Sequence, residues 1–154
     1  MKHTISVLAK NEAGVLSRIT NLFSSRGYNI ESLTVARTLD EKHARATIVT
    51  YGDDKVIEQI EKQLHKLIPV IKVTEMNSET STILELVLVK IVAKDSDTIE
   101  LLKLTESFGG KIINVCQKEY TIQAVCDEKQ LKSIIEILKP IGIKEIVHSG
   151  AVSI

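Results

Sequence analysis

The sequence predicts an α+β protein made of two ferredoxin-like βαββαβ units, because one order of strands and helices occurs twice along its 154 residues. Short segments alternate apolar and polar residues, which is typical of half-buried strands. Between them, apolar residues recur at the three- and four-residue spacing of helices. A polar segment, 77–82, separates the two copies of this pattern. We therefore expect two domains, 1–76 and 83–154, joined by a short linker.

The first unit is predicted to contain four strands and two helices. Its first helix follows from apolar residues that recur every three or four positions between 15 and 23, and Gly27 is a natural end for it. A second helix starts after Asp53 or Asp54, either of which can cap it, and its apolar face runs from Val56 to Leu67. The predicted strands cover residues 3–9, 29–39, 44–51 and 69–75.

The second unit repeats this order with different residues. Asp97 and Glu100 resemble a capping box ahead of its first helix. Asp127 and Gln130 form the same kind of pair ahead of its second helix, which Pro140 and Gly142 are expected to end. The predicted strands cover residues 83–93, 111–117, 120–125 and 143–154, and the middle two form a hairpin that turns near 118–119.

Composition excludes several classes of function. Lysine plus arginine number 20 and aspartate plus glutamate also 20, so no basic excess indicates a nucleic acid partner. No apolar run approaches the ~20 residues of a membrane span, and the N-terminus does not resemble a signal peptide, so we expect a cytoplasmic protein with no membrane contact. The histidines and the two cysteines, Cys116 and Cys126, lack the spacing of a metal site, and we expect the cysteines to be reduced.

Each predicted unit holds only about 75 residues, a size at which a single core gives marginal stability. An open antiparallel sheet also leaves unpaired edge strands, which can pair with a second chain. We therefore expect an oligomer.

One segment near the N-terminus has the features of a ligand site. Gly14 ends a loop between the first strand and the first helix, where a glycine permits positive φ or close approach of a ligand. The first amides of the helix have no intrahelical partners and, with the helix dipole, favour an anion such as an α-carboxylate. Asparagine side chains could meet the ammonium, and aliphatic residues the side chain, of an amino acid. The candidate residues are Asn11, Gly14, Val15, Leu16, Asn29 and Ile30, with Leu33 as a further apolar wall.

A simpler interpretation stays open on these grounds alone. Asparagine before a helix and glycine in a loop are common turn residues, and Asn29 could cap the end of the preceding helix.

Two stretches resemble a known family: Asn11-Glu-Ala-Gly-Val-Leu-Ser-Arg18 and Gly27-Tyr-Asn-Ile-Glu-Ser-Leu-Thr-Val35. Together they are similar to the signature of the small, regulatory subunit of acetolactate synthase (acetohydroxyacid synthase), and weaker similarity covers nearly the whole chain. The resemblance implies that the first half is an ACT domain and the second a smaller domain of related fold. It also implies that Asn11, Gly14 and the Val15 and Leu16 amides of one protomer face Asn29 and Ile30 of its partner across a bound ligand.

The resemblance further implies a non-catalytic homodimer that binds a branched-chain amino acid, usually valine. Its expected partner is the large catalytic subunit, which it would activate and through which it would mediate feedback inhibition by valine in branched-chain amino acid biosynthesis. Thiamine diphosphate, Mg and FAD are expected only in that catalytic partner, with no cofactor in this subunit.

Two rival functions remain at this point. A free-standing ACT-type sensor of another target would share the ligand loop. A small ferredoxin-like enzyme such as an acylphosphatase would need an arginine in a phosphate-binding loop, and the loop from Lys10 to Gly14 has none. Co-purification with a large thiamine-diphosphate-dependent protein would separate these possibilities.

Overall fold

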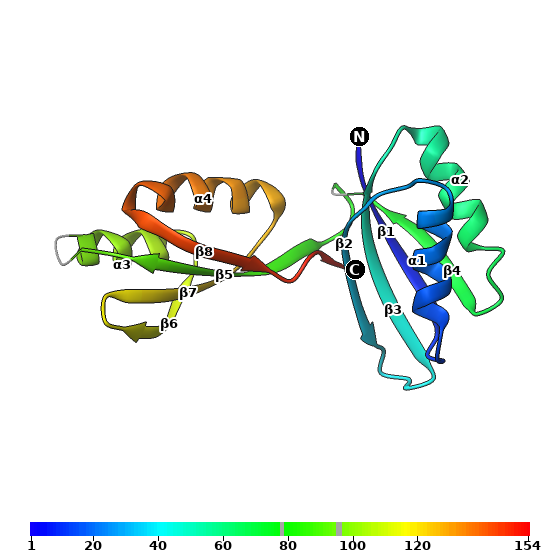
Figure 1. Cartoon of the computed structure of the whole chain (residues 1–154), viewed down its shortest axis with the longest axis horizontal. Helices are drawn as coiled ribbons and strands as arrows, with labels where there is room; N and C mark the ends of the chain where they lie inside the picture. The colour runs from blue at the N-terminus through cyan, green and yellow to red at the C-terminus, as the bar shows by residue number, and fades with distance from the viewer. Residues whose placement is uncertain (78, 95–96) are drawn as a thin grey trace. The chain divides into compact units, whose positions relative to one another are not determined.

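The computed structural model describes residues 1–77, 79–94 and 97–154, and backbone contacts divide the chain into two compact units (Figure 1). The first unit contains residues 1–83 together with Ala151–Ile154, and the second contains Leu84–Gly150. The contacts thus group the last four residues with the first unit, whereas the sequence pattern put them in the second domain. Within the predicted linker 77–82, Ser78 lies outside the described residues.

The first unit is a four-stranded antiparallel sheet with two helices on one face (Figure 1). The strand order is β2-β3-β1-β4, which leaves β2 and β4 at the edges. Its elements, in chain order, are β1 (Lys2–Lys10), α1 (Val15–Ser25), β2 (Ile30–Arg37), β3 (His43–Tyr51), α2 (Asp54–Leu64) and β4 (Val70–Met76).

The core of the first unit lies between the sheet and the helices and is almost entirely aliphatic. Ile5 and Ile48 face the helices from the two central strands, and Phe23 of α1 and Leu64 of α2 close the core from above; all four are 0% exposed. Each such buried side chain contributes about 1.5–3 kcal/mol through the hydrophobic effect. This core holds β1 and α1, and therefore the loop between them, in place.

The opposite face of this sheet carries a row of hydroxyl groups. Ser6 of β1 pairs in register with Thr47 of β3 on one side and with Thr74 of β4 on the other. Ser6 and Thr47 are nevertheless buried, and the Thr47 Oγ1 lies 3.4 Å from the Oγ of Ser153. Ser153 belongs to the short strand β9 (Val152–Ser153), which pairs with β5. The final residues of the sequence therefore cover part of the first unit's sheet.

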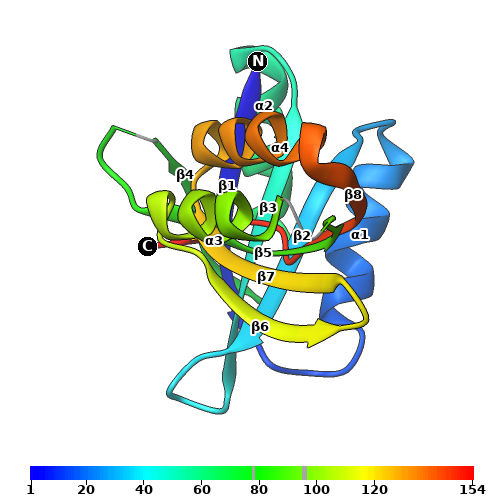
Figure 2. The ribbon, with the colours of Figure 1, turned by 90° about the vertical axis from the view of Figure 1, so that its left-hand side faces the viewer.

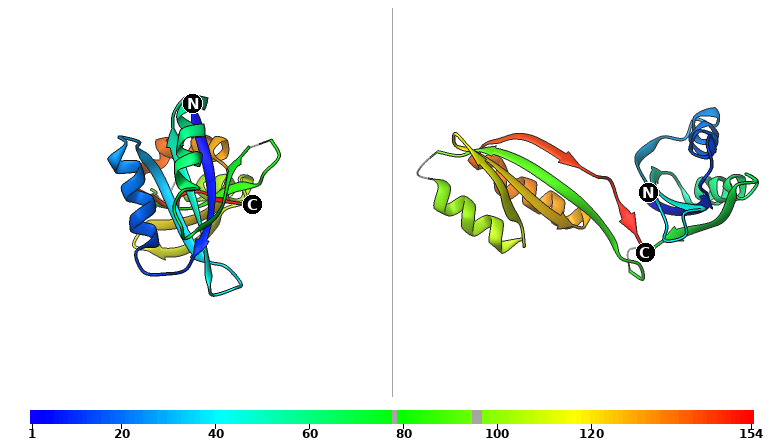
Figure 3. Two further views of the ribbon diagram at one scale, coloured as in Figure 1. Left: turned by 90° about the vertical axis from the view of Figure 1, so that its right-hand side faces the viewer. Right: turned by 90° about the horizontal axis from the view of Figure 1, so that it is seen from below.

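The second unit repeats the plan with a sheet of order β6-β7-β5-β8 and two helices on one face (Figure 2). Its aliphatic core includes Val87, Ile91, Leu101, Ile122 and Leu138. Its elements are β5 (Ile83–Val92), α3 (Thr98–Ser107), β6 (Lys111–Cys116), β7 (Glu119–Cys126), α4 (Glu128–Gly142) and β8 (Ile143–His148), and Figure 3 shows both units from two further sides.

One helix start in the second unit differs from the prediction, and one helix end agrees with it. The Asp97 side chain does not cap α3, because its backbone is already helical (φ −97°, ψ −6°) and not extended as a capping residue requires. Helix α4 ends at Gly142, two residues after Pro140, as predicted from these two residues. The capping box of Asp127 and Gln130 is confirmed.

Two strand predictions also need correction. The β6–β7 hairpin turns at Gln117 and Lys118, both with positive φ, one residue earlier than expected. The predicted strand 143–154 is interrupted after His148, and Gly150 has a positive φ at the break.

Both cysteines are free: Cys116 is exposed, whereas burial, together with the Glu85 and Asp127 carboxylates, raises the pKa of the Cys126 thiol.

No helix within the described ranges is both long enough and apolar enough to cross a membrane.

Candidate functional site

The loop that joins β1 to α1 ends in a glycine whose conformation few other residues adopt. Gly14 has φ +82° and ψ −5° and is the N-cap of α1. A Cβ placed on Gly14 would meet no atom within 4 Å, so no neighbouring group in the described chain requires a glycine there. The left-handed backbone therefore favours glycine, and the space beside it is open to an approaching molecule.

The N-terminus of α1 lacks the usual groups that satisfy its first amides. Gly14 offers no side chain, and the first turn contains no acidic residue. The Val15 amide donates to the Glu12 carbonyl at 3.3 Å, which leaves the amides of Leu16 and Ser17 as the donors nearest the open space. An anion placed here would gain both hydrogen bonds and the favourable end of the helix dipole.

The two aliphatic residues after Gly14 point in different directions. The Val15 side chain is 7% exposed and belongs to the core, so it cannot form an apolar wall for a ligand. Leu16 is 43% exposed and is free to form an apolar wall.

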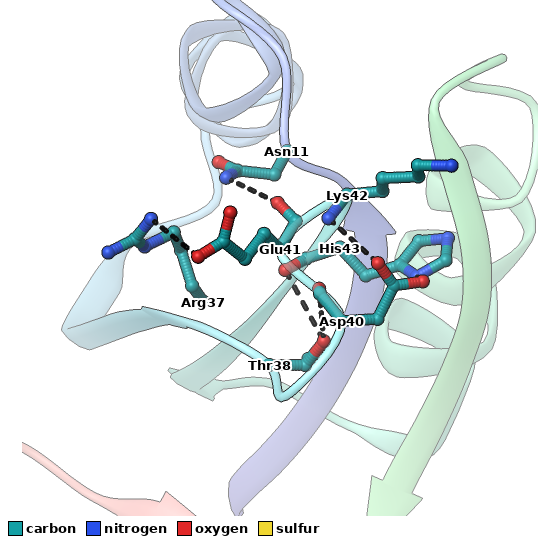
Figure 4. A network of polar contacts seen from close by, with 7 residues as sticks. All are labelled: Asn11, Arg37, Thr38, Asp40, Glu41, Lys42 and His43. Carbon is teal, nitrogen blue, oxygen red and sulfur yellow. Dashed lines mark hydrogen bonds and ion pairs between the residues drawn. The ribbon is translucent and has the colours of Figure 1, made fainter.

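Asn11 is held by the turn between β2 and β3 (Figure 4). Its side-chain Nδ2 donates to the Glu41 carbonyl at 2.9 Å, and its backbone amide donates to the Lys42 carbonyl at 2.8 Å. Because the side-chain Nδ2 donates to the turn, the Asn11 side chain presents its Oδ1, a hydrogen-bond acceptor, to the surroundings of the loop. This turn was not among the sequence-predicted site residues, although the Thr38-Leu-Asp40 spacing is typical of a tight turn.

Asn29 and Ile30 lie at the other end of the same sheet. Ile30 is paired with Thr50, whose hydroxyl donates to the Asn29 carbonyl at 2.6 Å. Thr50 in turn pairs with His3, at the start of β1, whereas Asn11 follows the end of β1. Seven residue steps of strand separate His3 from Lys10, which corresponds to about 20 Å.

The structure thus brings the predicted site residues together in two groups. Asn11, Gly14, Val15 and Leu16 form one group at the β1–α1 loop, and Asn29 and Ile30 form the other. One chain cannot place both groups around a single amino acid, because such a ligand is far shorter than the distance between them. Among the described residues, no cluster of three or more histidine, cysteine or acidic side chains could hold a metal ion.

Comparison with known proteins extends over the whole chain. Residues 5–72 match a family model described as an AHAS small subunit-like ACT domain, and residues 84–154 match one described as the small subunit of acetolactate synthase. The acetolactate synthase isozyme 3 small subunit of Escherichia coli is 45% identical and aligns with 100% of this chain and 95% of its own length. The probable acetolactate synthase small subunit of Archaeoglobus fulgidus is 44% identical, over 99% and 96% respectively.

A solved structure agrees with this result. The acetolactate synthase small subunit from Thermotoga maritima superimposes with a TM-score of 0.90 at 36% identity, covering 100% of this chain and 96% of its own. The fold and the glycine loop define an ACT-domain protein with a second ferredoxin-like unit. Because both units match at high coverage, the chain belongs to the acetolactate synthase small-subunit family.

Proposed function

We propose that this chain is the regulatory subunit of acetolactate synthase, which activates a thiamine-diphosphate-dependent catalytic subunit and makes it sensitive to valine. The observation that carries the proposal is the match of both units to the small-subunit family. The open glycine at the N-terminus of α1 supports the sensing part of it.

The ligand would bind by its three chemically distinct parts. Its carboxylate would accept from the amides after Gly14, its ammonium would donate to asparagine oxygens, and its aliphatic side chain would contact Leu16 and Ile30. Hydrogen bonds to charged groups contribute about 1.5–3 kcal/mol each, and burial of a valine-sized side chain a similar amount. After the costs of ordering and association, micromolar-to-millimolar affinity is expected, a range suited to feedback by a metabolite.

A homodimer would unite the two groups of site residues. Strand β2 has a neighbouring strand on one side only in the described sheet, so its other edge can pair with β2 of a second copy. Antiparallel pairing about a two-fold axis would set Ile30 of one copy opposite Arg37 of the other. Arg37 leads into the turn that holds Asn11, so Asn29 of the partner subunit would reach the β1–α1 loop.

The catalytic partner would supply the chemistry. Thiamine diphosphate, Mg and FAD would bind there and form acetolactate from pyruvate, while this subunit would bind no cofactor. Ligand binding can shift the activating form only if the ligand's affinity differs between the activating and inactive forms. A cytoplasmic location remains part of the proposal.

The test replaces Gly14 with aspartate, whose carboxylate would occupy the position proposed for the ligand carboxylate. Gly14→Asp should still raise catalytic-subunit activity, because the second unit has its own core, but should lose valine inhibition. Asn29→His, which changes the opposite side of the proposed site, should also keep the activation and lose valine inhibition. Acetolactate formation, measured with and without valine, reports both properties.

Gly109→Asp is a matched control. Gly109 also has a positive φ (+69°) and open space around its Cβ position, but it lies in the second unit. The Gly109→Asp variant should introduce similar backbone strain and leave valine inhibition unchanged. Full valine sensitivity in both Gly14→Asp and Asn29→His would place the site elsewhere. Valine binding without any effect on the catalytic subunit would instead favour a free-standing sensor.

A further inference from the structure

We propose that the β2–β3 turn, residues 38–43, orients Asn11 for the amino acid ligand, with Thr38 and Asp40 as positioning residues. The inference rests on the proposed function, since it concerns the same ligand loop. It assigns a role to residues that would not touch the ligand themselves.

The turn is braced from within by its own polar groups (Figure 4). The Thr38 hydroxyl donates to the Asp40 carbonyl at 2.8 Å, and the Asp40 Oδ1 accepts from the Lys42 amide at 3.0 Å. The same carboxylate lies 2.9 Å from the His43 Nδ1 through its other oxygen. Backbone bonds between Thr38 and His43 and between His43 and Asp40, at 3.0 and 2.9 Å, close the ends of the turn.

Between these braces lie the two carbonyls that hold Asn11. They belong to Glu41 and Lys42, and both act through the backbone, so their direction depends on the conformation of the turn. The Glu41 side chain points elsewhere: it is 86% exposed, and its carboxylate lies 3.9 Å from the Arg37 guanidinium. Thr38 and Asp40 therefore set the direction of the carbonyls, and the carbonyls set the orientation of the Asn11 amide.

The orientation of Asn11 decides which end of its amide a ligand meets. With Nδ2 donating to Glu41, the Oδ1 is available to accept from an ammonium. Without that bond the amide can rotate, and half of its orientations would present a donor to the positively charged group. Loss of the brace should thus weaken amino acid binding by about three- to tenfold, the range expected for one hydrogen bond.

The experiment measures valine binding to the full-length chain by calorimetry, together with the melting temperature and the NMR signals of the Asn11 side-chain amide. Thr38→Val removes the hydroxyl at nearly constant volume, and Thr38→Ser restores it. Asp40→Ala removes the carboxylate that braces the turn, and Asp54→Ala removes an exposed carboxylate of equal charge elsewhere in the first unit, at the start of α2.

Thr38→Val and Asp40→Ala should weaken valine binding three- to tenfold and shift the Asn11 amide signals, whereas Thr38→Ser and Asp54→Ala should resemble the original chain. A role confined to folding would change the melting temperature and leave the Asn11 signals in place, which would overturn the inference. Equal losses in Asp40→Ala and Asp54→Ala would also overturn it, because charge alone would then explain the effect. If Asp40→Ala does not fold, the Thr38→Val and Thr38→Ser pair decides. Failure of the original chain to bind valine would instead refute the proposed function.

Discussion

Two neighbouring aspartates, Asp53 and Asp54, have different positions at the start of α2. Asp53 is extended (φ −86°, ψ 169°), and its side chain accepts from the Val56 amide at 2.8 Å. Asp54 is the first helical residue and is exposed. Only Asp53 satisfies one of the amides that the helix leaves unpaired.

Asp53→Ala should therefore lower the free energy of unfolding by about 1 kcal/mol. Asp54→Ala removes the same charge from the same helix end and should cost only a few tenths of a kcal/mol through the dipole. Urea unfolding of the two variants measures the difference. Equal losses would mean that charge, and not the capping hydrogen bond, stabilises this end of α2.

For single residues, hydrogen bonds between near neighbours in the sequence were predictable, and contacts between residues far apart in the sequence were not. Capping by Asp127 and Gln130 follows from residues three apart, and the structure contains it. Asn11 could be picked out as a polar residue next to Gly14, but its partners are carbonyls some thirty residues later. Because a backbone carbonyl is present at every residue, no sequence pattern indicates which one Asn11 meets.

Among the elements, the β6–β7 hairpin has an unfavourable backbone at its turn. Its two turn residues, Gln117 and Lys118, have φ of +47° and +70°, although neither is glycine or asparagine. Hairpins with a two-residue turn usually place asparagine and glycine at these positions because both tolerate positive φ.

Gln117→Asn should stabilise the protein by about 0.5 kcal/mol, since asparagine adopts the left-handed region at lower cost. Gln123→Asn makes the same chemical change within β7, where asparagine is unfavourable, and should destabilise slightly. Thermal unfolding of both variants provides the comparison, and a destabilised Gln117→Asn would contradict the argument.

Within the described parts of the chain, the strands β1 to β8 and the helices α1 to α4 were predictable from periodicity, because burial of one face imposes the period of two in a strand and 3.6 in a helix. Errors arose where tertiary packing outweighs local preference. The predicted strand 143–154 is interrupted after His148, and the Ser149 amide there donates to the Leu86 carbonyl at 2.9 Å. The two residues are 63 positions apart in the sequence, so no local pattern reveals this contact.

For the whole molecule, the proposed dimer makes the ligand site depend on assembly. Val35 is 42% exposed on the edge strand β2, where a second copy would pair. Val35→Lys would place a charge at that edge, a change that opposes strand pairing. The variant should sediment as a monomer at micromolar concentration and should lose valine binding together with the dimer.

Val115→Lys is the corresponding change in the second unit, at an exposed valine (58%) on its edge strand β6. It should remain dimeric and bind valine normally. A monomeric Val35→Lys that still binds valine at full affinity would exclude a site shared between two copies.

The grouping of Ala151–Ile154 with the first unit has a consequence for biosynthesis. Residues 1–83 leave the ribosome well before Ser153, because all of residues 84–150 must be translated in between. During that interval the Thr82 backbone lacks the two 3.0 Å hydrogen bonds that it exchanges with Ile154, and Thr47 lacks its contact with Ser153. The row of hydroxyl groups on the first unit's sheet therefore stays exposed to water on the nascent chain. The first unit is completed only after the second unit has been translated.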